Sequence, residues 1–538
     1  MLVEKDGVTR RYFIKSGIAA MGAATLPFSN MTAQNNKAKY TRYNVMSPGG
    51  RKALASYANG VRAMLKLPAD HPQNWFRNAF IHLMDCPHGN WWFYVWHRGY
   101  LGYFEQTIRN LSGDSEFAMP YWDWTTLPQI PDPMFDDALS PQNPPFEPYT
   151  RNLAVFIKFI QPTLFAYWKT LTPAQLAQLK IRGYTGPDKV WNDVTGFDPT
   201  SGNGISGNMA YAITCGSRYL TRDNPKLDAS TAKDVSAQVV CAGLAPRDFN
   251  STNISNSFTS SKTASHNSPP GAFSILEGLP HNKVHNYIGG VGPVDPGPYG
   301  NMTNFLSPVD PVFFLHHSNM DRLWDVWTRK QQRLGLPYLP TGQDLTTLSN
   351  EPFLFYVNGN GQPVGNSKAG DYLSMAKFEY DYEPGFGEAC IAPAVAAPQA
   401  KPPIKATVKG NEASVTLPTA TIKTHLAAEA APSLVAEITL PHPGANSSGR
   451  EFDVIVGGPP DLAQAGPDSP YYAGTIAFFG HMMNMTGAHD VTFAVPLPKT
   501  AEAFPNLTAA NAAVNIRVVP RSPGQKATVV RAVTIDTR

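Results

Sequence analysis

Cysteine is scarce in this chain, which has only four cysteines among 538 residues. So few cysteines cannot build the disulfide framework that holds small secreted domains together. A bond between Cys215 and Cys241 is one option that the sequence leaves open. The fold must therefore be held mainly by a packed core.

Charge and long apolar runs are also in short supply. Charged residues make up 16% of the chain and the net charge is +3, which argues against a nucleic-acid-binding surface. No apolar run reaches the roughly 20 residues of a membrane span. The length of 538 residues predicts two domains, and 49 prolines with 43 glycines predict a loop-rich enzyme.

Histidine is concentrated where charge is sparse. Two stretches rich in Trp, Phe and Tyr contain seven of the 13 histidines. A buried neutral imidazole needs a partner, and these surroundings offer little except a metal ion. Imidazoles without carboxylates favour copper over calcium, magnesium or manganese, whereas zinc suits the same donors. The seven are His82, His88, His97, His281, His285, His316 and His317.

Local signals place these histidines on helices. Pro280 suits a first helical turn and Gly289-Gly290 ends it, so His281 and His285 project from one face. Asp310-Pro311 starts another helix, with Asp310 as its cap, that carries the His-His pair. Apolar periodicity predicts further helices over residues 53–66, 75–84 and 91–111.

Both stretches resemble the copper-binding halves of tyrosinases, catechol oxidases and molluscan haemocyanins, the binuclear copper proteins. The resemblance covers roughly residues 40 to 390. The first half matches through Cys86-Pro87-His88, the nine-residue step to His97, and His97-Arg98-Gly99-Tyr100 with Glu105. The second matches through His281-Asn282-Lys283-Val284-His285 and from Asp310-Pro311 to Asp321-Arg322.

The resemblance implies two copper ions, Cu A and Cu B. It assigns Cu A to His82, His88 and His97, and Cu B to His281, His285 and His317. It leaves His316 and Asp321 just outside the ligand set. It also implies a thioether between Cys86 and His88; the alternative is a buried free thiol that packs as a small apolar residue.

The activity implied is oxidation of o-diphenols (catechols) to o-quinones with dioxygen, together with hydroxylation of monophenols. Glu277 and Asn282 would hold a water that deprotonates the phenol, whose pKa is about 10. The alternative is that Glu277 only caps its helix. Neither the natural phenol nor the oligomeric state follows from the sequence.

Three other functions compete with this one. An oxygen carrier of haemocyanin type is disfavoured by a single copper domain and an export signal. A zinc hydrolase would need a carboxylate base and only one cluster. A catechol oxidase without activity on monophenols would share the whole site.

The amino-terminal residues Thr9-Arg10-Arg11-Tyr12-Phe13-Ile14-Lys15 precede a weakly apolar stretch and are typical of a twin-arginine signal. Residues 1–33 are therefore interpreted as an export signal, which predicts a periplasmic or extracellular protein.

The rest of the chain divides into two predicted domains. Residues 40–390 form a mainly α, loop-rich catalytic domain in which a four-helix bundle holds the two coppers. Its loops are expected over residues 128–150 and 185–270. The motif Tyr380-Asp381-Tyr382, which in relatives meets an arginine, closes this domain against Arg42. A Pro- and Ala-rich linker, residues 391–405, follows.

Residues 406–538 are predicted to form an all-β sandwich. Short β-branched runs recur at 433–440, 452–456, 474–479, 490–497, 514–519 and 527–535. In relatives such a domain covers the copper site and keeps the precursor latent, as in a zymogen. The plugging side chain is expected between Val456 and Gly474, where Leu462, Tyr471 and Tyr472 are available.

Overall fold

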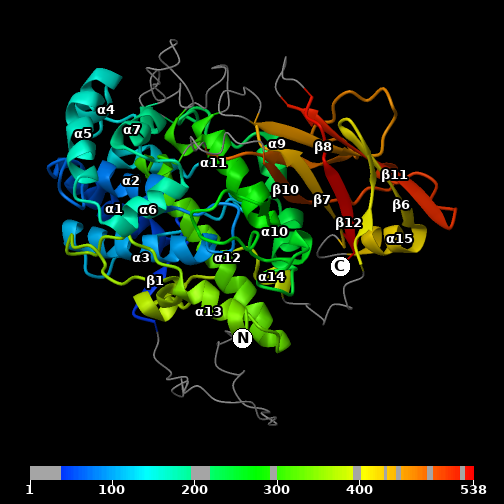
Figure 1. Ribbon diagram of the computed structural model, residues 1–538, viewed down its shortest axis with the longest axis horizontal. Helices are drawn as coiled ribbons and strands as arrows, with labels where there is room; N and C mark the ends of the chain where they lie inside the picture. The colour runs from blue at the N-terminus through cyan, green and yellow to red at the C-terminus, as the bar shows by residue number, and fades with distance from the viewer. Residues whose placement is uncertain are drawn as a thin grey trace, which may run out of the picture. The chain divides into compact units, whose positions relative to one another are not determined.

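The computed structural model describes residues 38–195, 218–290, 300–303, 305–391, 402–428, 433–443, 450–480, 489–521 and 527–537. Residues from Lys39 onward form one compact unit. Helices dominate it up to residue 391 and strands dominate it from residue 402 (Figure 1). This confirms the predicted fold class. The interpreted export signal, Cys215 and most of the predicted linker lie outside the described residues.

As predicted, four helices contribute to the histidine clusters; they carry five of the seven histidines, while His88 lies in a loop and His281 in a short helical turn. The four helices are α2 (Trp75–Asp85), α3 (Phe93–Ser112), α11 (Asn282–Gly289) and α12 (Val312–Leu334). Asn74 caps α2 by accepting from the backbone N–H of Phe76, and left-handed Gly113 ends α3. The N-cap of α12 is Pro311 rather than the predicted Asp310; Asp310 lies one residue earlier and accepts from the Val312 N–H at 3.0 Å.

The start of the second cluster differs from the prediction. A π-helical turn, Glu277–His281, precedes α11 and contains Pro280, so Pro280 does not occupy a first α-helical turn. Gly290, with φ of 89°, ends α11 as expected. The wider turn places His281 at the junction of the two helical segments.

The remaining helices surround this bundle. Four of them, α4, α7, α9 and α10, fall where long loops were predicted, because short segments carry weak periodicity. They are α1 (Pro48–Lys66), α4 (Glu147–Thr150), α5 (Leu153–Trp168), α6 (Pro173–Ile181), α7 (Pro187–Thr195), α9 (Ala229–Asp234), α10 (Ala237–Leu244), α13 (Gly342–Asn350), α14 (Glu388–Ile391) and α15 (Thr419–Ala427). No helix among the described residues has both the length and the apolar character that crossing a membrane requires.

The carboxy-terminal strands form two five-stranded sheets, in the orders β2-β10-β7-β12-β4 and β5-β6-β11-β8-β9. Each of the six predicted runs overlaps an observed strand. The strands are β2 (Ala272–Phe273), β4 (Ile404–Lys405), β5 (Thr407–Lys409), β6 (Glu412–Pro418), β7 (Leu434–Pro441), β8 (Glu451–Val456), β9 (Tyr472–Ala477), β10 (Asp490–Pro496), β11 (Asn511–Pro520) and β12 (Ala532–Thr537).

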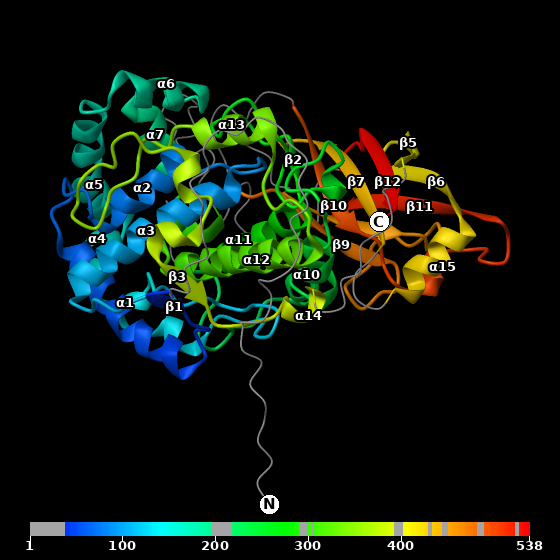
Figure 2. The same cartoon turned by 90° about the horizontal axis from the view of Figure 1, so that it is seen from below.

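The sandwich is joined directly to the helical region. Strand β2 comes from the chain just before the second histidine cluster, yet it pairs in parallel with β10 of the sandwich. Phe273 of β2 stacks on Phe493 of β10 with centroids 4.9 Å apart. Figure 2 shows β2 and β10 side by side at this boundary. One sheet therefore takes strands from both predicted domains.

The disulfide differs from the option that the sequence left open. Cys241 of α10 bonds to Cys390 of α14, 149 residues away, rather than to Cys215. This bond ties the end of the helical region to α10. Cys86 is a buried free thiol.

Arg42 lies at the centre of a buried ion network, as the resemblance implied. Its strand β1 (Tyr40–Arg42) pairs in parallel with β3 (Tyr380–Tyr382). Arg42 Nε donates to Glu105 Oε1 at 2.8 Å, and Nη1 donates to Asp321 Oδ2 at 3.0 Å and to Tyr382 Oη at 2.7 Å. The guanidinium therefore holds β1 and β3, the first and last strands of the helical region, against α3 and α12.

We expect Arg42→Ala to lower the free energy of unfolding by roughly 3–5 kcal/mol, because it removes the cation that pairs with both oxygens of buried Glu105 and one of the two arginines that pair with buried Asp321. Arg62, whose ion pair with Asp137 is 35% and 40% exposed, is the matched control. Arg62→Ala should cost at most about 1 kcal/mol in denaturant unfolding. Equal losses in the two variants would contradict the role given to Arg42.

Candidate metal centre

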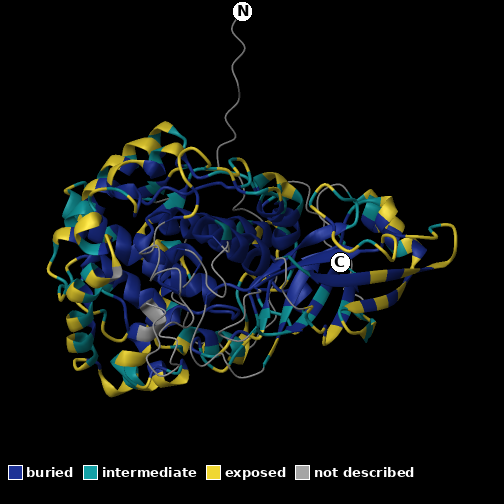
Figure 3. Cartoon of the chain, turned by 90° about the horizontal axis from the view of Figure 1, so that it is seen from above, coloured by how far each residue is buried: buried dark blue, intermediate teal, exposed yellow. Residues whose placement is uncertain are grey.

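The histidines gather into two buried clusters. The first is His82, Cys86, His88 and His97, and the second is His281, His285, His316 and His317; within each, one ligand atom per residue lies within 4.8 Å of the others. Every one of these histidines is at most 5% exposed. Figure 3 shows that buried residues fill the interior of the molecule and that exposed residues lie at its edge. His97 and His317 stack with centroids 4.0 Å apart, so the clusters face each other.

Hydrogen bonds fix the tautomers of four of these rings. In each, Nδ1–H donates to a fixed oxygen, which leaves the Nε2 lone pair available. The acceptors are Phe305 O for His82 (2.7 Å), Phe93 O for His97 (2.7 Å), Met302 O for His285 (2.8 Å) and Asn282 Oδ1 for His281 (2.9 Å). Nε2 of His82 and of His281 is buried and makes no hydrogen bond to the described residues.

Burial keeps these imidazoles neutral. It lowers the pKa of His82 and of His281 to about 3, and it lowers the pKa of the other five well below the ordinary value. Neutral imidazoles with free Nε2 lone pairs are ligands for a soft or borderline metal ion. The clusters thus hold donors that are desolvated and ready to bind metal.

His316 and His317 are adjacent but have different partners. Trp124 Nε1–H, which can only donate, donates to His316 Nδ1 at 3.1 Å. The Nδ1 lone pair of His316 is therefore in use, and its ring proton must sit on Nε2. His317 Nε2 instead lies 3.0 Å from His285 Nε2. This geometry favours His317 over His316 as a metal ligand.

Cys86 lies against the ring of His88. Its Sγ is 3.7 Å from Nδ1 and 3.6 Å from Nε2 of that ring, and 3.3 Å from His97 Nε2. Because the sulfur is almost equally far from both nitrogens, it lies near the plane that bisects the line between them. This plane contains Cε1, the ring carbon between the two nitrogens. Burial raises the pKa of the Cys86 thiol, so the thiol is protonated in the absence of metal.

Glu277 is buried and does not cap its own helix. Its Oε1 accepts from the Gly89 N–H at 2.6 Å, and its Oε2 accepts from Ser260 Oγ. Burial raises the pKa of this carboxyl to about 8. Glu277 therefore links the second cluster to the residue that follows His88. Ser260 was not anticipated, because its loop has no regular pattern.

Asn282 lies between the second cluster and the sandwich. Its Oδ1 accepts from His281, and its Nδ2 donates to Ala477 O of β9 at 2.9 Å. The predicted site residue Asp321 touches no imidazole of the clusters; it accepts from Arg42, Arg98, Tyr380 and Tyr382. Arg98 directly follows His97, so Asp321 supports the first cluster through α3.

His266 supports the first cluster and was missed by the sequence analysis. Its Nε2 lies 2.9 Å from Asp85 Oδ1 and its Nδ1 lies 2.6 Å from Glu351 Oε1. Burial opposes protonation, but the two carboxylates raise the pKa of His266 overall. The imidazolium thus holds the end of α2, next to Cys86, against the end of α13.

The side chain that covers the site is Phe479, not Leu462, Tyr471 or Tyr472. Its ring centroid lies 4.2 Å from that of His285, 5.0 Å from His88 and 5.5 Å from His281. The chain turns at Gly480, whose φ is 72° and where a Cβ would approach the Phe305 ring to 2.5 Å. An aromatic side chain of the carboxy-terminal region thus lies against the clusters, but it is not one of the three residues expected between Val456 and Gly474.

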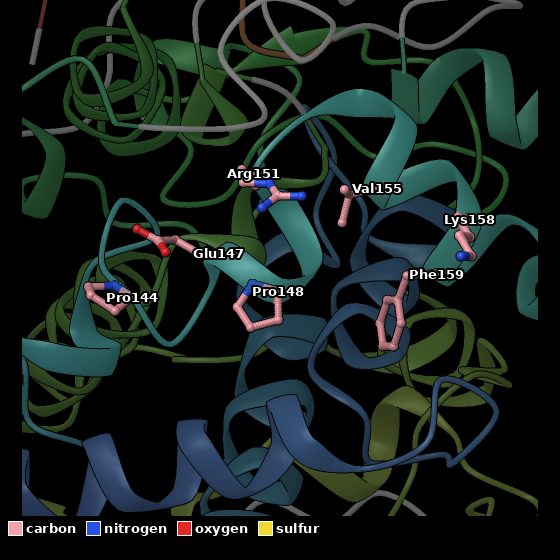
Figure 4. A pocket seen from close by; sticks show the side chains of 7 residues that line it. All are labelled: Pro144, Glu147, Pro148, Arg151, Val155, Lys158 and Phe159. Carbon is pink, nitrogen blue, oxygen red and sulfur yellow. The ribbon is translucent and has the colours of Figure 1, made fainter.

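One open groove among the described residues lies away from the histidines. It is lined by Pro144, Glu147, Pro148, Arg151, Val155, Lys158 and Phe159 at α4 and α5 (Figure 4). None of these residues belongs to either cluster. The histidine centre itself is closed in this structure, with Phe479 only 6% exposed.

The donors fit copper. The first cluster offers three imidazoles and the second four, with no carboxylate in either, and the orphaned Nε2 atoms of His82 and His281 need a partner that the described protein atoms do not supply. The two clusters therefore suit two copper ions, one in each.

Comparison with known proteins gives the same result. Residues 62–330 match the model of the common central domain of tyrosinase. Polyphenol oxidase II, chloroplastic, from Ipomoea batatas is 26% identical over 349 residues, which are 62% of this chain and 48% of that protein. Hemocyanin A-type of Enteroctopus dofleini is 34% identical over 113 residues, only 21% of this chain and 9% of that protein.

The fold is shared with a solved relative. The structure of latent apple tyrosinase superposes with a TM-score of 0.53 and 18% sequence identity, and the match covers 94% of this chain and 98% of that one. The chain spans about half the length of the curated relatives it matches. Two opposed histidine clusters on four helices, with a family match spanning half of the sequence, place this chain in the tyrosinase family.

Proposed function

We propose that this protein is a copper-dependent polyphenol oxidase, which oxidises o-diphenols to o-quinones with dioxygen and hydroxylates monophenols. The observation that carries the proposal is the pair of opposed clusters of buried, neutral imidazoles with Nε2 atoms directed inward. Copper bound there supplies the redox chemistry with dioxygen. The chain's own residues orient the ligands, exclude water and control access of the phenol.

A haemocyanin-type oxygen carrier is the second candidate. The likeness to haemocyanin covers only 21% of the chain, whereas the likeness to the polyphenol oxidase covers 62%. An aromatic ring already lies against His285 at 4.2 Å, which supports a centre that accepts phenolic rings. Catechol turnover by the copper-loaded protein distinguishes an enzyme from a carrier.

The proposed ligands are His82, His88 and His97 for one copper, and His281, His285 and His317 for the other. The contact between Cys86 Sγ and the His88 ring supports a thioether between them, which would fix a ligand that lies on a loop. Intact-mass analysis tests that crosslink.

The sandwich is proposed to keep the enzyme latent, and the apple tyrosinase with the same fold is likewise a latent form. Phe479 occupies the space beside three proposed ligands, His88, His281 and His285. Because the sandwich belongs to the same chain, its effective concentration at the site is high even if each contact is weak.

Glu277 and Asn282 are proposed to hold the water that deprotonates a monophenol. The raised pKa of Glu277, about 8, supports a group that changes protonation near neutral pH. Catechol oxidation does not depend on this step in the same way. Monophenol hydroxylation and catechol oxidation should therefore respond differently when the Glu277 carboxyl is ionised or replaced.

Export by the twin-arginine route is proposed from Arg10-Arg11 and the residues around them. This route carries folded proteins, which suits a chain that acquires metal before export. Cell fractionation tests the proposal.

The first prediction separates the adjacent histidines. His317→Ala should hold one copper per chain instead of two, because it removes the partner of His285 Nε2. His316→Gln is the matched control and should hold two, since its amide can still accept from Trp124. Metal analysis of the purified proteins checks this, and the reverse pattern would contradict the assignment.

The second prediction concerns Phe479. In the intact chain, Phe479→Ala should raise catechol turnover several-fold with an unchanged copper content, because it opens the space beside His285. Tyr471→Ala, which truncates an aromatic residue of the sandwich outside this contact, should leave turnover at the wild-type level. Latency that survives Phe479→Ala would show that another contact closes the site.

The third prediction concerns Glu277. As pH rises through about 8, more of this carboxyl ionises, so the ratio of tyrosine hydroxylation to catechol oxidation should rise. In Glu277→Gln the ratio should be low and should lose this rise, while catechol oxidation serves as the internal control. Equal losses on both substrates would indicate a purely structural role.

A further inference from the structure

Helix α11 carries two asparagines, each one residue after a proposed ligand. Asn282 follows His281, and Asn286 follows His285. Both are fully buried. Asn282 Nδ2 donates to Ala477 O at 2.9 Å, and Asn286 Nδ2 donates to Phe478 O at 3.2 Å. The two residues that precede Phe479 are thus held by successive side chains of one metal-binding helix.

The two asparagines differ in what their carbonyl oxygens do. Asn282 Oδ1 accepts from His281 Nδ1 at 2.9 Å, whereas Asn286 Oδ1 is buried without a partner among the described residues. Because Ala477 O and His281 Nδ1–H have fixed roles, the orientation of the Asn282 amide is determined. The amide of Asn282 therefore connects β9, the strand that precedes Phe479, to the proposed metal ligand His281.

This connection is particular to His281. The rings of His82, His97 and His285 donate to backbone carbonyls within the helical region, at Phe305, Phe93 and Met302. The acceptor for His281 is a side chain, which the sandwich holds in place. The partner on Nδ1 fixes the orientation and basicity of the metal-binding Nε2. The Nδ1 partner of His281 is thus itself held by β9 of the sandwich.

We propose that Asn282 is a positioning residue through which sandwich docking and copper retention at His281 strengthen each other. The proposal rests on the copper function proposed above and adds a second role to the sandwich, which would support the metal as well as cover it. Linkage requires the two effects to be equal: metal tightens docking by the factor by which docking tightens metal binding. The free energy contributed by one amide hydrogen bond corresponds to a factor of roughly 5 in each binding constant.

Hydrogen–deuterium exchange on the intact chain tests the proposal. Protection of the backbone amides at residues 472–480 is compared between metal-free and copper-loaded protein. Loading should increase protection roughly 5-fold in the wild type, and Asn282→Ala should lose this gain. Asn282→Ala should also release one of its two coppers to a Cu(I) chelator roughly 5-fold faster than the wild type.

Asn286→Ala is the matched control, because it removes hydrogen bonds to the sandwich, at Phe478 O and Glu451 Oε1, without touching a ligand. It should lower protection in both states and keep the copper-dependent gain. If Asn282→Ala keeps the gain, the coupling runs through the packing of Phe479 and the proposal is overturned. A wild type without any gain overturns it as well.

A conservative variant separates positioning from folding. Asn282→Asp keeps an acceptor for His281 but removes the N–H that donates to Ala477 O, so it should also lose the copper-dependent gain. If it retains the gain, the amide is not the link. Failure of the copper function itself would be seen separately, as fewer than two coppers per wild-type chain before exchange begins.

Discussion

The structure depends on one constraint: seven neutral imidazoles are buried in an aromatic interior and must be satisfied there. Burial removes water from each ring and prevents protonation, so hydrogen bonds and metal are the remaining partners. Four Nδ1 atoms donate to fixed oxygens, and this directs Nε2 toward the centre. The ion network of Arg42 and the imidazolium of His266 then hold the helices that carry these rings.

The local part of this arrangement could be predicted from the sequence. His281 and His285 are spaced for one helical face, Gly289-Gly290 ends that helix, and β-branched runs give the sandwich strands. Each of these signals lies within a few residues. The contact between Arg42 and Tyr382 joins distant segments, and only resemblance to a family made it predictable.

The parts that sequence analysis missed are mostly contacts between distant residues. Cys241 bonds to a cysteine 149 positions away, and β2 joins a sheet whose other strands begin at residue 404. Phe479 was predicted as the last residue of a strand over 474–479, whereas β9 ends at Ala477, and nothing local distinguishes Phe479 from Tyr471 as the covering side chain. The π-helical turn at Pro280 was missed because a proline early in a helix normally indicates an ordinary first turn.

The sandwich contacts the helical region at the residues of α11 that lie next to the proposed ligands. Lys283, between two proposed ligands, pairs with Glu451 of β8, while Asn282 and Asn286 hold the carbonyls that precede Phe479. Buried polar contacts of this kind specify one docking geometry more than they add stability. The sandwich and the histidine clusters therefore form one structural unit. For this reason the site is closed while its imidazoles are already oriented.

We propose that two metal ions are held by imidazole nitrogens alone, with Cys86 outside the ligand set. Copper K-edge X-ray absorption of the intact, copper-loaded chain tests it most directly. We expect nitrogen neighbours typical of imidazole around both ions and no sulfur neighbour. A sulfur ligand, or a copper bound by carboxylate oxygen, would contradict it.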